Sequence, residues 1–343
     1  MKTKYLSTLS GDGNYDFSNG DGNVAKWRHP VGLVMDSAGN LYVGEWDNCC
    51  IRKVTQAGVT STFSGMCTVC GFADGSASTA KFDHPGLMTI DKNDIIYVAG
   101  HNDGRIRKVL PDGSVTTFAG GSTMNNIDGP ALSARFNYPF DVKIDASGNL
   151  FVADKDNHLI RKISLGVVSL YAGSSVGHAD GAWYQVRFRQ PSGLAIDSNG
   201  NVFVSDTGNR VIRKIDVDRF VTTISGTIIS GYSIRGYADG ALSESLFTEP
   251  RGIHIDNNGT LYVADWDSST IRAIYPENQC VSGSALCVGQ DYKCRSGLCV
   301  ERLAGTGYNA WHDGDRLTVI LIFIQFCSYW NYVYRLHLVV RLD

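Results

Sequence analysis

Nine cysteines give this sequence its widest choice of chemistry, because a thiol can form a disulfide, bind zinc as a thiolate or remain free. Four of them fall in one segment rich in glycine and serine: Cys280, Cys287, Cys294 and Cys299. The segment has too few apolar side chains for a core, so we expect two disulfides to hold it, with the pairing left open. Zinc is the weaker alternative there, since the segment contains no Cys-x-x-Cys pair.

A recurring acid and a recurring arginine are the second set of residues with possible chemistry. The acid is found at Glu45, Asp154, Asp206 and Asp265, and the arginine at Arg52, Arg107, Arg161, Arg213 and Arg272. Residues that recur at a fixed offset in every repeat are normally part of the repeat, so we expect acid–arginine pairs between neighbouring strands. The second repeat has Gly100 at the acidic position and should lack the pair.

Five repeats carry these residues. Each begins at a proline, continues through two apolar runs and ends near Ile-Arg; the prolines are Pro30, Pro85, Pro139, Pro191 and Pro250, at intervals of 55, 54, 52 and 59 residues. An Asp-Gly phrase precedes the later repeats, with Asp74, Asp128, Asp180 and Asp239 each eleven residues before the next proline. Each repeat resolves into four short strands with tight turns, as the 38 glycines suggest. Four antiparallel strands at this period are typical of a β-propeller blade.

The repeats resemble NHL repeats with a long Asp-Gly-x-x-x-x-x-x-Phe loop before each blade, over roughly residues 4–315. The resemblance implies an all-β, NHL-type β-propeller with five recognisable four-stranded blades. Residues 4–11 match a fourth strand that lacks its first three, so we expect this N-terminal strand to close a degenerate sixth blade. The propeller would span residues 4–316, with the cysteine segment 280–299 as an insertion in blade five.

The hydrophobic tail, residues 317–343, shows none of the repeat's marks. Its β-branched and aromatic residues favour the degenerate sixth blade. Two alternatives stay open: a membrane segment in the uncharged run 317–334, which is short for a span, and the end of a corrupted gene model.

An enzyme of the lactonase or amidating-lyase kind would need metal ligands or catalytic groups on the innermost strands. The central position of those strands is occupied by Val34, Thr89, Lys143, Ala195 and His254, which is not a ring of histidines or carboxylates. We therefore expect no catalytic residue, no metal and no cofactor, and interpret Lys143 and His254 as partnered polar side chains. The sequence favours a protein that is not an enzyme.

A second cysteine group consists of Cys49, Cys50, Cys67 and Cys70. The loop after the second strand of a blade and the loop after its fourth open on the same side, so these cysteines should lie close together. Disulfides are the first interpretation, free thiols the second and a four-thiolate zinc site the third. Disulfides would favour a secreted or cell-surface protein, yet the N-terminus shows no signal peptide; either the true N-terminus is missing or the protein is intracellular.

Composition narrows the class of partner. The chain is 343 residues long and 43% hydrophobic, with 31 Lys+Arg against 34 Asp+Glu, so nucleic acid is disfavoured. We expect a rigid scaffold that recognises a protein or another extracellular macromolecule through loops on one face, with a hydrolase or lyase as the alternative. A membrane is a partner only if residues 317–334 insert. The expected contact residues are Asp47, Asn48, Asn102, Asp103, Asp156, Asn157, Asn209 and Asp267.

Overall fold

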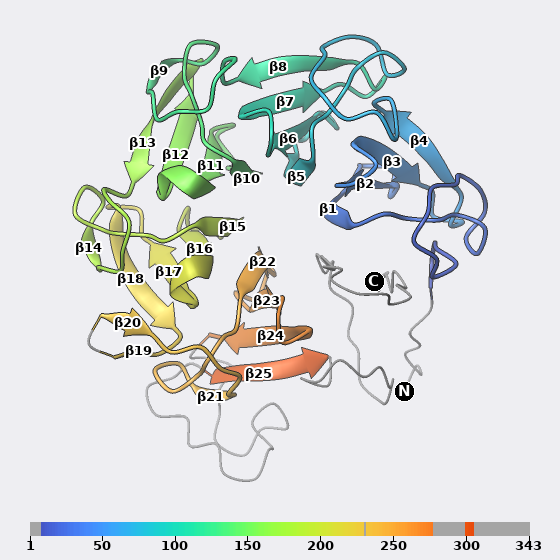
Figure 1. The fold of residues 1–343 in the computed structure, drawn as a ribbon. Coiled ribbons are helices and arrows are strands. Elements are labelled where there is room, and N and C mark those ends of the chain that lie inside the picture. The colour runs from blue at the N-terminus through green and yellow to red at the C-terminus, as the bar shows by residue number, and fades with distance from the viewer. Residues whose placement is uncertain (1–7, 230, 277–298, 305–343) are drawn as a thin grey trace. The chain divides into compact units, whose positions relative to one another are not determined.

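The computed structural model describes residues 8–229, 231–276 and 299–304 (Figure 1). The chain forms two compact units, one up to residue 170 and one from residue 171, and the boundary falls within a single strand, β13 (Val167–Ala172). The predicted cysteine insertion apart from Cys299, the sixth blade and the tail lie outside the described residues, as does most of the predicted N-terminal strand. Its described part, residues 8–11, is not a strand.

The first unit holds three antiparallel blades. Blade one is formed by β1 (Pro30–Met35), β2 (Leu41–Glu45), β3 (Cys50–Val54) and β4 (Thr60–Ser64). Blade two is formed by β5 (Pro85–Ile90), β6 (Ile96–Gly100), β7 (Arg105–Val109) and β8 (Val115–Ala119). Blade three is formed by β10 (Pro139–Ile144), β11 (Leu150–Asp154), β12 (Leu159–Ser164) and β13. The first strands β1, β5 and β10 contact one another in sequence order.

The second unit holds two blades of the same design. Blade four is formed by β15 (Pro191–Ile196), β16 (Val202–Asp206), β17 (Val211–Ile215) and β18 (Phe220–Ser225). Blade five is formed by β22 (Pro250–Ile255), β23 (Leu261–Asp265), β24 (Thr270–Tyr275) and β25 (Cys299–Ala304). A small hairpin of β19 (Ile228–Ile229) and β20 (Tyr232–Ser233) follows blade four. The fold class is that of an all-β β-propeller, as predicted, and the described residues contain five four-stranded blades.

The Asp-Gly loop before a blade adds a short strand to that blade's outer edge. These strands are β9 (Gly129–Pro130), β14 (Gly181–Ala182) and β21 (Gly240–Ala241), which pair with the fourth strands β13, β18 and β25. In blades one and two the same contact is a single bridge, from Gly20 to Thr60 and from Gly75 to Val115. The loop therefore covers the exposed hydrogen-bonding edge of its own blade.

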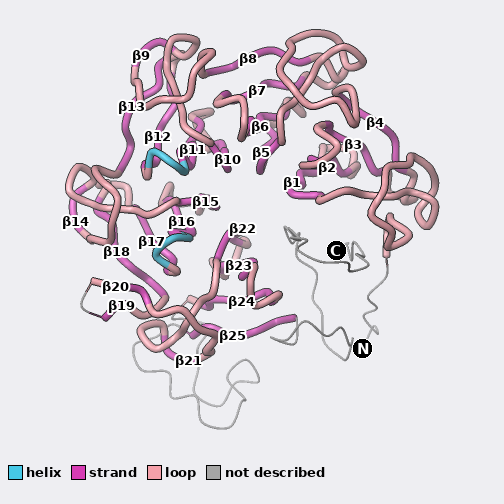
Figure 2. Tube along the Cα trace, viewed as in Figure 1, coloured by secondary structure: helices cyan, strands magenta, loops and turns pink. Residues whose placement is uncertain are grey.

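Turn chemistry sets the strand lengths. Gly39 and Gly148 adopt φ values of 80° and 83° in the first turns of blades one and three, where the Gly-Asn pairs predicted a left-handed residue. Helix is confined, in the described part of the chain, to two single 3₁₀ turns, η1 (Lys155–Asn157) and η2 (Thr207–Asn209), drawn in cyan in Figure 2. Among these residues no helix is long and apolar enough to cross a bilayer.

Apolar side chains from neighbouring blades form the cores within each unit. In the first unit, Tyr42 and Ile51 of blade one pack with Phe82, Met88 and Val98 of blade two and the loop before it. A second core joins blades two and three around Ile106, Phe136 and Val152. Strands covered on both sides are apolar along their whole length, which explains the continuous apolar runs in the repeats.

Candidate functional site

A buried arginine lies at the centre of each blade's polar network. In blade three, Arg161 Nη1 donates to Asp154 Oδ2 at 2.9 Å and to the carbonyl of Arg135 at 3.3 Å, while its Nη2 pairs with Asp128. In blade four, Arg213 pairs with Asp206 at 2.8 Å and with Asp180 at 2.6 Å. The predicted acid–arginine pairs are confirmed.

The Asp-Gly loop supplies the rest of each arginine's surroundings, which the sequence reasoning missed. Besides the aspartate, the loop's phenylalanine lies against the guanidinium: Phe136 is 5.4 Å from Arg161, and Phe188 is 5.1 Å from Arg213. Blade one has Trp27 in this place, 4.3 Å from Arg52. In the loops before blades two to five, Asp and Phe stand eight residues apart because both contact one arginine side chain, and this spacing was the available signal.

Burial governs the charges of these networks. It raises the pKa of Asp154 and of Asp206 to about 6, although each carboxylate accepts hydrogen bonds and faces an arginine. Burial likewise lowers the pKa of Arg52 and raises that of its partner Glu45. These arginines and acids are buried and bond to one another within the blade, so they are not accessible to a ligand.

Blade two corrects the prediction that it lacks an acid–arginine pair. Asp103, three residues after Gly100, pairs with Arg107 at 3.3 Å and is buried. A side chain at Gly100 would place its Cβ 2.1 Å from Asp103 Oδ1, so the carboxylate of Asp103 fills the space left by the missing acid. Burial raises the pKa of Asp103 to about 6, as it does for the acids in blades three and four.

Three further residues of the predicted contact surface also belong to the arginine networks. Asn48, Asn157 and Asn209 each donate from Nδ2 to the acid of their own blade, at 3.0, 2.8 and 2.8 Å. Elsewhere, Asp267 pairs with Arg235 at 2.6 Å, and the backbone amide of Asp156 donates to Asn137. The remaining two, Asp47 and Asn102, contact histidines that the sequence reasoning did not select.

These histidines lie at the proline end of the blades, by which we mean the end where the first strand begins and the second strand finishes. Two positions there differ from blade to blade. The residue before the proline is His29, His84, Tyr138, Gln190 or Glu249, and the residue after the acidic position is Trp46, His101, Lys155, Thr207 or Trp266. A backbone hydrogen bond joins the two positions in blades one, two and five, as from Trp46 to His29 at 3.0 Å. Side chains of different chemistry therefore occupy the same backbone geometry.

The residue before the proline adopts an unusual conformation. His29, His84, Tyr138 and Gln190 have φ values of 41°, 51°, 51° and 48°, in the left-handed region that non-glycine residues rarely occupy. Strained positions of this kind persist only where the surrounding structure fixes them.

In the first unit these positions form an aromatic–histidine cluster of Trp46, His84, His101, Tyr138 and Phe140. The Trp46 ring lies 4.7 Å from His101 and 5.4 Å from His84, measured between ring centroids. His101 in turn lies 4.9 Å from Tyr138 and 5.6 Å from Phe140. The cluster combines flat apolar surfaces with imidazole nitrogens, a composition suited to recognition.

Each histidine at this end has a polar neighbour at Nδ1. His29 contacts Asp47 at 2.6 Å, and His101 contacts Asn102 Oδ1 at 2.9 Å. Burial lowers the pKa of His101 to about 4, which leaves its ring neutral at pH 7, and its Nε2 is buried without a hydrogen-bond partner. Burial raises the pKa of Asp47, but hydrogen bonds from His29 and Tyr15 outweigh this and hold the net value below the ordinary one.

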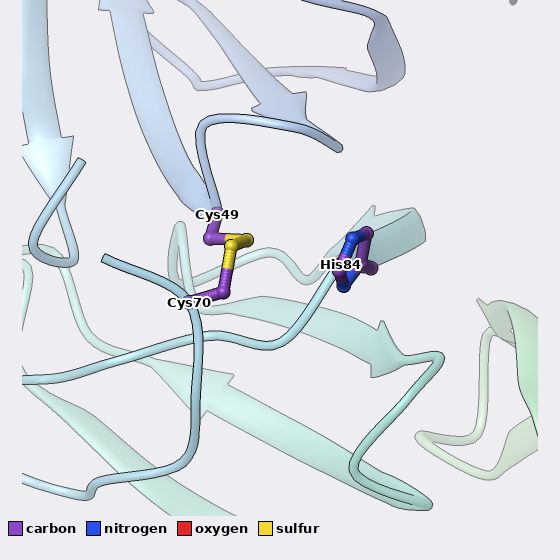
Figure 3. Close-up of side chains that lie close together, drawn as sticks. All are labelled: Cys49, Cys70 and His84. Atoms are coloured by element: carbon purple, nitrogen blue, oxygen red, sulfur yellow. A yellow bond between two sulfur atoms is a disulfide. The ribbon is translucent and has the colours of Figure 1, made fainter. Parts of the chain in front are cut away.

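Two disulfides fix the adjoining loops, as the first interpretation of this cysteine group predicted. Cys49 pairs with Cys70 and Cys50 pairs with Cys67, which ties the start of β3 to the loop after β4. Figure 3 shows His84 beside the Cys49–Cys70 bridge. The two sulfurs and one ring nitrogen of His84 lie within 4.8 Å of one another, the one such potential metal-ligand group among the described residues.

The second unit has its own polar group at the proline end. Arg251 lies 4.0 Å from the Trp266 ring and pairs with Glu249 at 2.5 Å. The Thr207 hydroxyl donates to the Pro250 carbonyl at 2.6 Å and contacts Ser192. On the first strands, Lys143 of the first unit pairs with Asp141 at 2.6 Å, as expected of a partnered polar residue.

A family model described as "SMP-30/Gluconolactonase/LRE-like region" matches residues 121–286. Among curated proteins, Protein SUPPRESSOR OF QUENCHING 1, chloroplastic, of Arabidopsis thaliana is 26% identical over 286 residues, covering 78% of this chain and 27% of that protein. NHL repeat-containing protein 2 of Homo sapiens is 27% identical over 282 residues, covering 71% of this chain and 38% of that protein. The chain thus spans well under half the length of these relatives.

A solved gluconolactonase of Xanthomonas campestris superposes with a TM-score of 0.51 at 13% identity, covering 79% of this chain and 75% of that one, a likeness in fold. The repeats, the four-stranded blades and the NHL repeat-containing relatives agree with one another. Together they support an NHL-type β-propeller family for this chain.

Proposed function

We propose that this protein is a non-catalytic recognition module that binds a protein or another extracellular macromolecule through the proline ends of its blades. The observation that carries the proposal is the aromatic–histidine cluster of the first unit, most of whose residues stand at positions that differ from blade to blade. Positions that recur in every blade, such as the arginine and its acids, are used within the blade. The residues before the proline and after the acidic position share a backbone conformation but differ in side chain from blade to blade, so their side chains can be used to contact a ligand.

The local chemistry supports a macromolecular ligand. Trp46 and Tyr138 are the residue types most enriched at the centres of protein interfaces. The loops that present Trp46 are held by two disulfides, so little conformational entropy is lost when a partner binds. A rigid aromatic surface with polar edges is the usual composition of an interface core.

Site-specific photo-crosslinking tests the proposal. A benzophenone amino acid replaces Trp46 in one variant and Ala38 in another; Ala38 lies in the exposed turn at the opposite end of blade one. Both proteins are irradiated with the secreted proteins of the source organism. We expect a crosslinked product at position 46 that excess unmodified chain suppresses and the Trp46→Ala variant does not. Equal products at both positions, or none at 46, would contradict the proposal.

A hydrolase or lyase is the second candidate, favoured by the match to the gluconolactonase-like family model. Purified chain is assayed for lactone hydrolysis with and without added divalent cations. Turnover that rises with protein concentration and is lost in the His254→Ala variant would establish this alternative, because His254 is the one histidine at the central position of a first strand.

A further inference from the structure

We propose that in the reduced protein Cys49, Cys70 and His84 bind a zinc-type divalent cation, so that the Cys49–Cys70 disulfide and the metal exclude each other. The proposal goes beyond recognition by the cluster and does not depend on it. It starts from the three donor atoms, which lie within 4.8 Å of one another. Two thiolates and an imidazole are ligands that zinc prefers, and a fourth position would remain for water.

The separations suit a tetrahedral ion. With Zn–S bonds of about 2.3 Å, two sulfurs in a tetrahedral site are roughly 3.8 Å apart. Breaking the disulfide lets the sulfurs of Cys49 and Cys70 move apart by rotation about their side-chain bonds. The neighbouring Cys50–Cys67 bridge still links the same two loops, and so limits how far the ligands can separate.

His84 is already oriented as a metal ligand. Its Nδ1 lies 2.6 Å from Asp83 Oδ1 and 2.9 Å from Asn102 Nδ2. In the tautomer that the proposal requires, Nδ1 carries the ring proton and donates it to the Asp83 carboxylate. Nε2 then carries the lone pair that a cation needs. A carboxylate behind the histidine is the usual outer-sphere partner of zinc-bound imidazole.

The two bridges differ in access to a reductant. Each bridge has one fully buried cysteine, Cys49 or Cys50. The partner of Cys49, Cys70, is exposed, whereas the partner of Cys50, Cys67, is only partly exposed, so the Cys49–Cys70 bridge is open to attack at Cys70. A dithiol attacks the exposed bridge by thiol–disulfide exchange, gives up two electrons and two protons, and is itself oxidised to a disulfide. Cys49 and Cys70 become thiols, and binding one divalent cation then releases their two protons.

Cobalt(II) and zinc titrations of the full chain after limited dithiol reduction test the proposal. We expect reduced protein to bind Co²⁺ with the intense visible absorption of a tetrahedral thiolate site, and protein with both bridges intact to lack this absorption. His84→Gln should weaken zinc binding at least tenfold and alter the cobalt spectrum. Asp83→Asn should weaken it by a smaller factor.

His29→Gln is the matched control, because His29 occupies the same repeat position and also contacts an aspartate, yet within the described residues it belongs to no group of potential metal ligands. It should bind metal as the unmodified protein does. Because the seven other cysteines can also bind metal once they are reduced, the readout is the difference in metal binding between variants, with Cys70→Ser included. Equal affinity and spectrum in the unmodified, His84→Gln and Cys70→Ser proteins would overturn the proposal, as would binding that is unchanged by reduction.

Discussion

At the scale of single residues, the arginine in each blade is buried and makes charge-assisted hydrogen bonds in several directions. Arg161→Ala removes the partner of Asp154, which is fully buried. Removing one member of a buried ion pair leaves the other charge unpaired and typically lowers the stability by about 3–5 kcal/mol. We expect the free energy of unfolding to fall by about this amount in urea denaturation. Lys162→Ala, at the partly exposed neighbouring position, should change it little, and a similar loss in both variants would contradict the assignment.

The acid–arginine pairs were predictable because they recur at fixed offsets, but Asp103 was not. An alignment of repeats compares equivalent positions, whereas Asp103 reaches the arginine from a different one. Asp103 can replace the missing acid only because Gly100 has no side chain and leaves room for its carboxylate. This space is visible in the structure but not in the sequence.

The acid of blade two can therefore be moved from position 103 back to position 100 by mutation. Gly100→Asp alone should destabilise the protein, since it crowds a second carboxylate against Asp103. Asp103→Asn alone removes the buried acid beside Arg107. The double variant restores the arrangement of Asp154 and Asn157 in blade three, so a double-mutant cycle should show a favourable coupling of about 1–3 kcal/mol. Additive losses would show that the two positions act independently.

His101 gives the stability a pH dependence of known sign. Its folded pKa of about 4 lies below the ordinary 6.5, so the unfolded chain binds more protons between these values. This contribution to stability is present above pH 6.5 and is lost as the pH falls towards 4. Between pH 7 and pH 5 it amounts to about 1–2 kcal/mol. His101→Phe should reduce the loss measured by denaturation at the two pH values, and an unchanged loss in this variant would contradict the assignment.

At the scale of elements, the four strands of each blade followed from the repeated pattern of apolar runs and turns. The edge strands β9, β14 and β21 did not, because each has two residues and pairs with a strand about forty residues (β9, β14) or sixty residues (β21) further along the chain. A strand of two residues is too short to show a periodic pattern in the sequence. It forms only because the fourth strand of its blade offers a free hydrogen-bonding edge.

Asp180 anchors the loop before blade four to this edge. Its carboxylate accepts hydrogen bonds from the backbone and hydroxyl of Thr223 and from Arg213. Asp180→Ala should speed amide hydrogen exchange in residues 174–190 and at Thr223, as detected by mass spectrometry. Asp180→Asn should have a smaller effect, because blade one has Asn19 at this position, bonded to Thr62 at 3.1 Å. Exchange as slow in the Ala variant as in the unmodified protein would contradict this role.

At the scale of the whole molecule, the sequence was sufficient for family and fold class but not for the aromatic–histidine cluster. Trp46, His84 and Tyr138 come from three different repeats, and each looks like an isolated substitution in the alignment. Only the stacking of the blades within the first unit brings them together, so the proposed site depends on tertiary packing.

The number of free thiols in the unreduced protein tests the disulfides predicted for the cysteine insertion. Of the nine cysteines, four are paired in the described residues, and two further disulfides are predicted among Cys280, Cys287, Cys294 and Cys299. Alkylation of the denatured, unreduced protein should then find one free thiol, at Cys327. Five free thiols would mean that the insertion contains no disulfide.

The arginine networks also have a consequence for the order of events during synthesis. Arg213 takes its partners from residues 7, 26, 33 and 34 positions earlier in the chain, all of which leave the ribosome before it does. A ribosome adding about 5–20 residues per second completes one repeat in roughly 3–11 s, far longer than strand pairing requires. Blade four can thus complete this network while blade five is still being translated, and protease protection of stalled nascent chains would reveal each closure in turn.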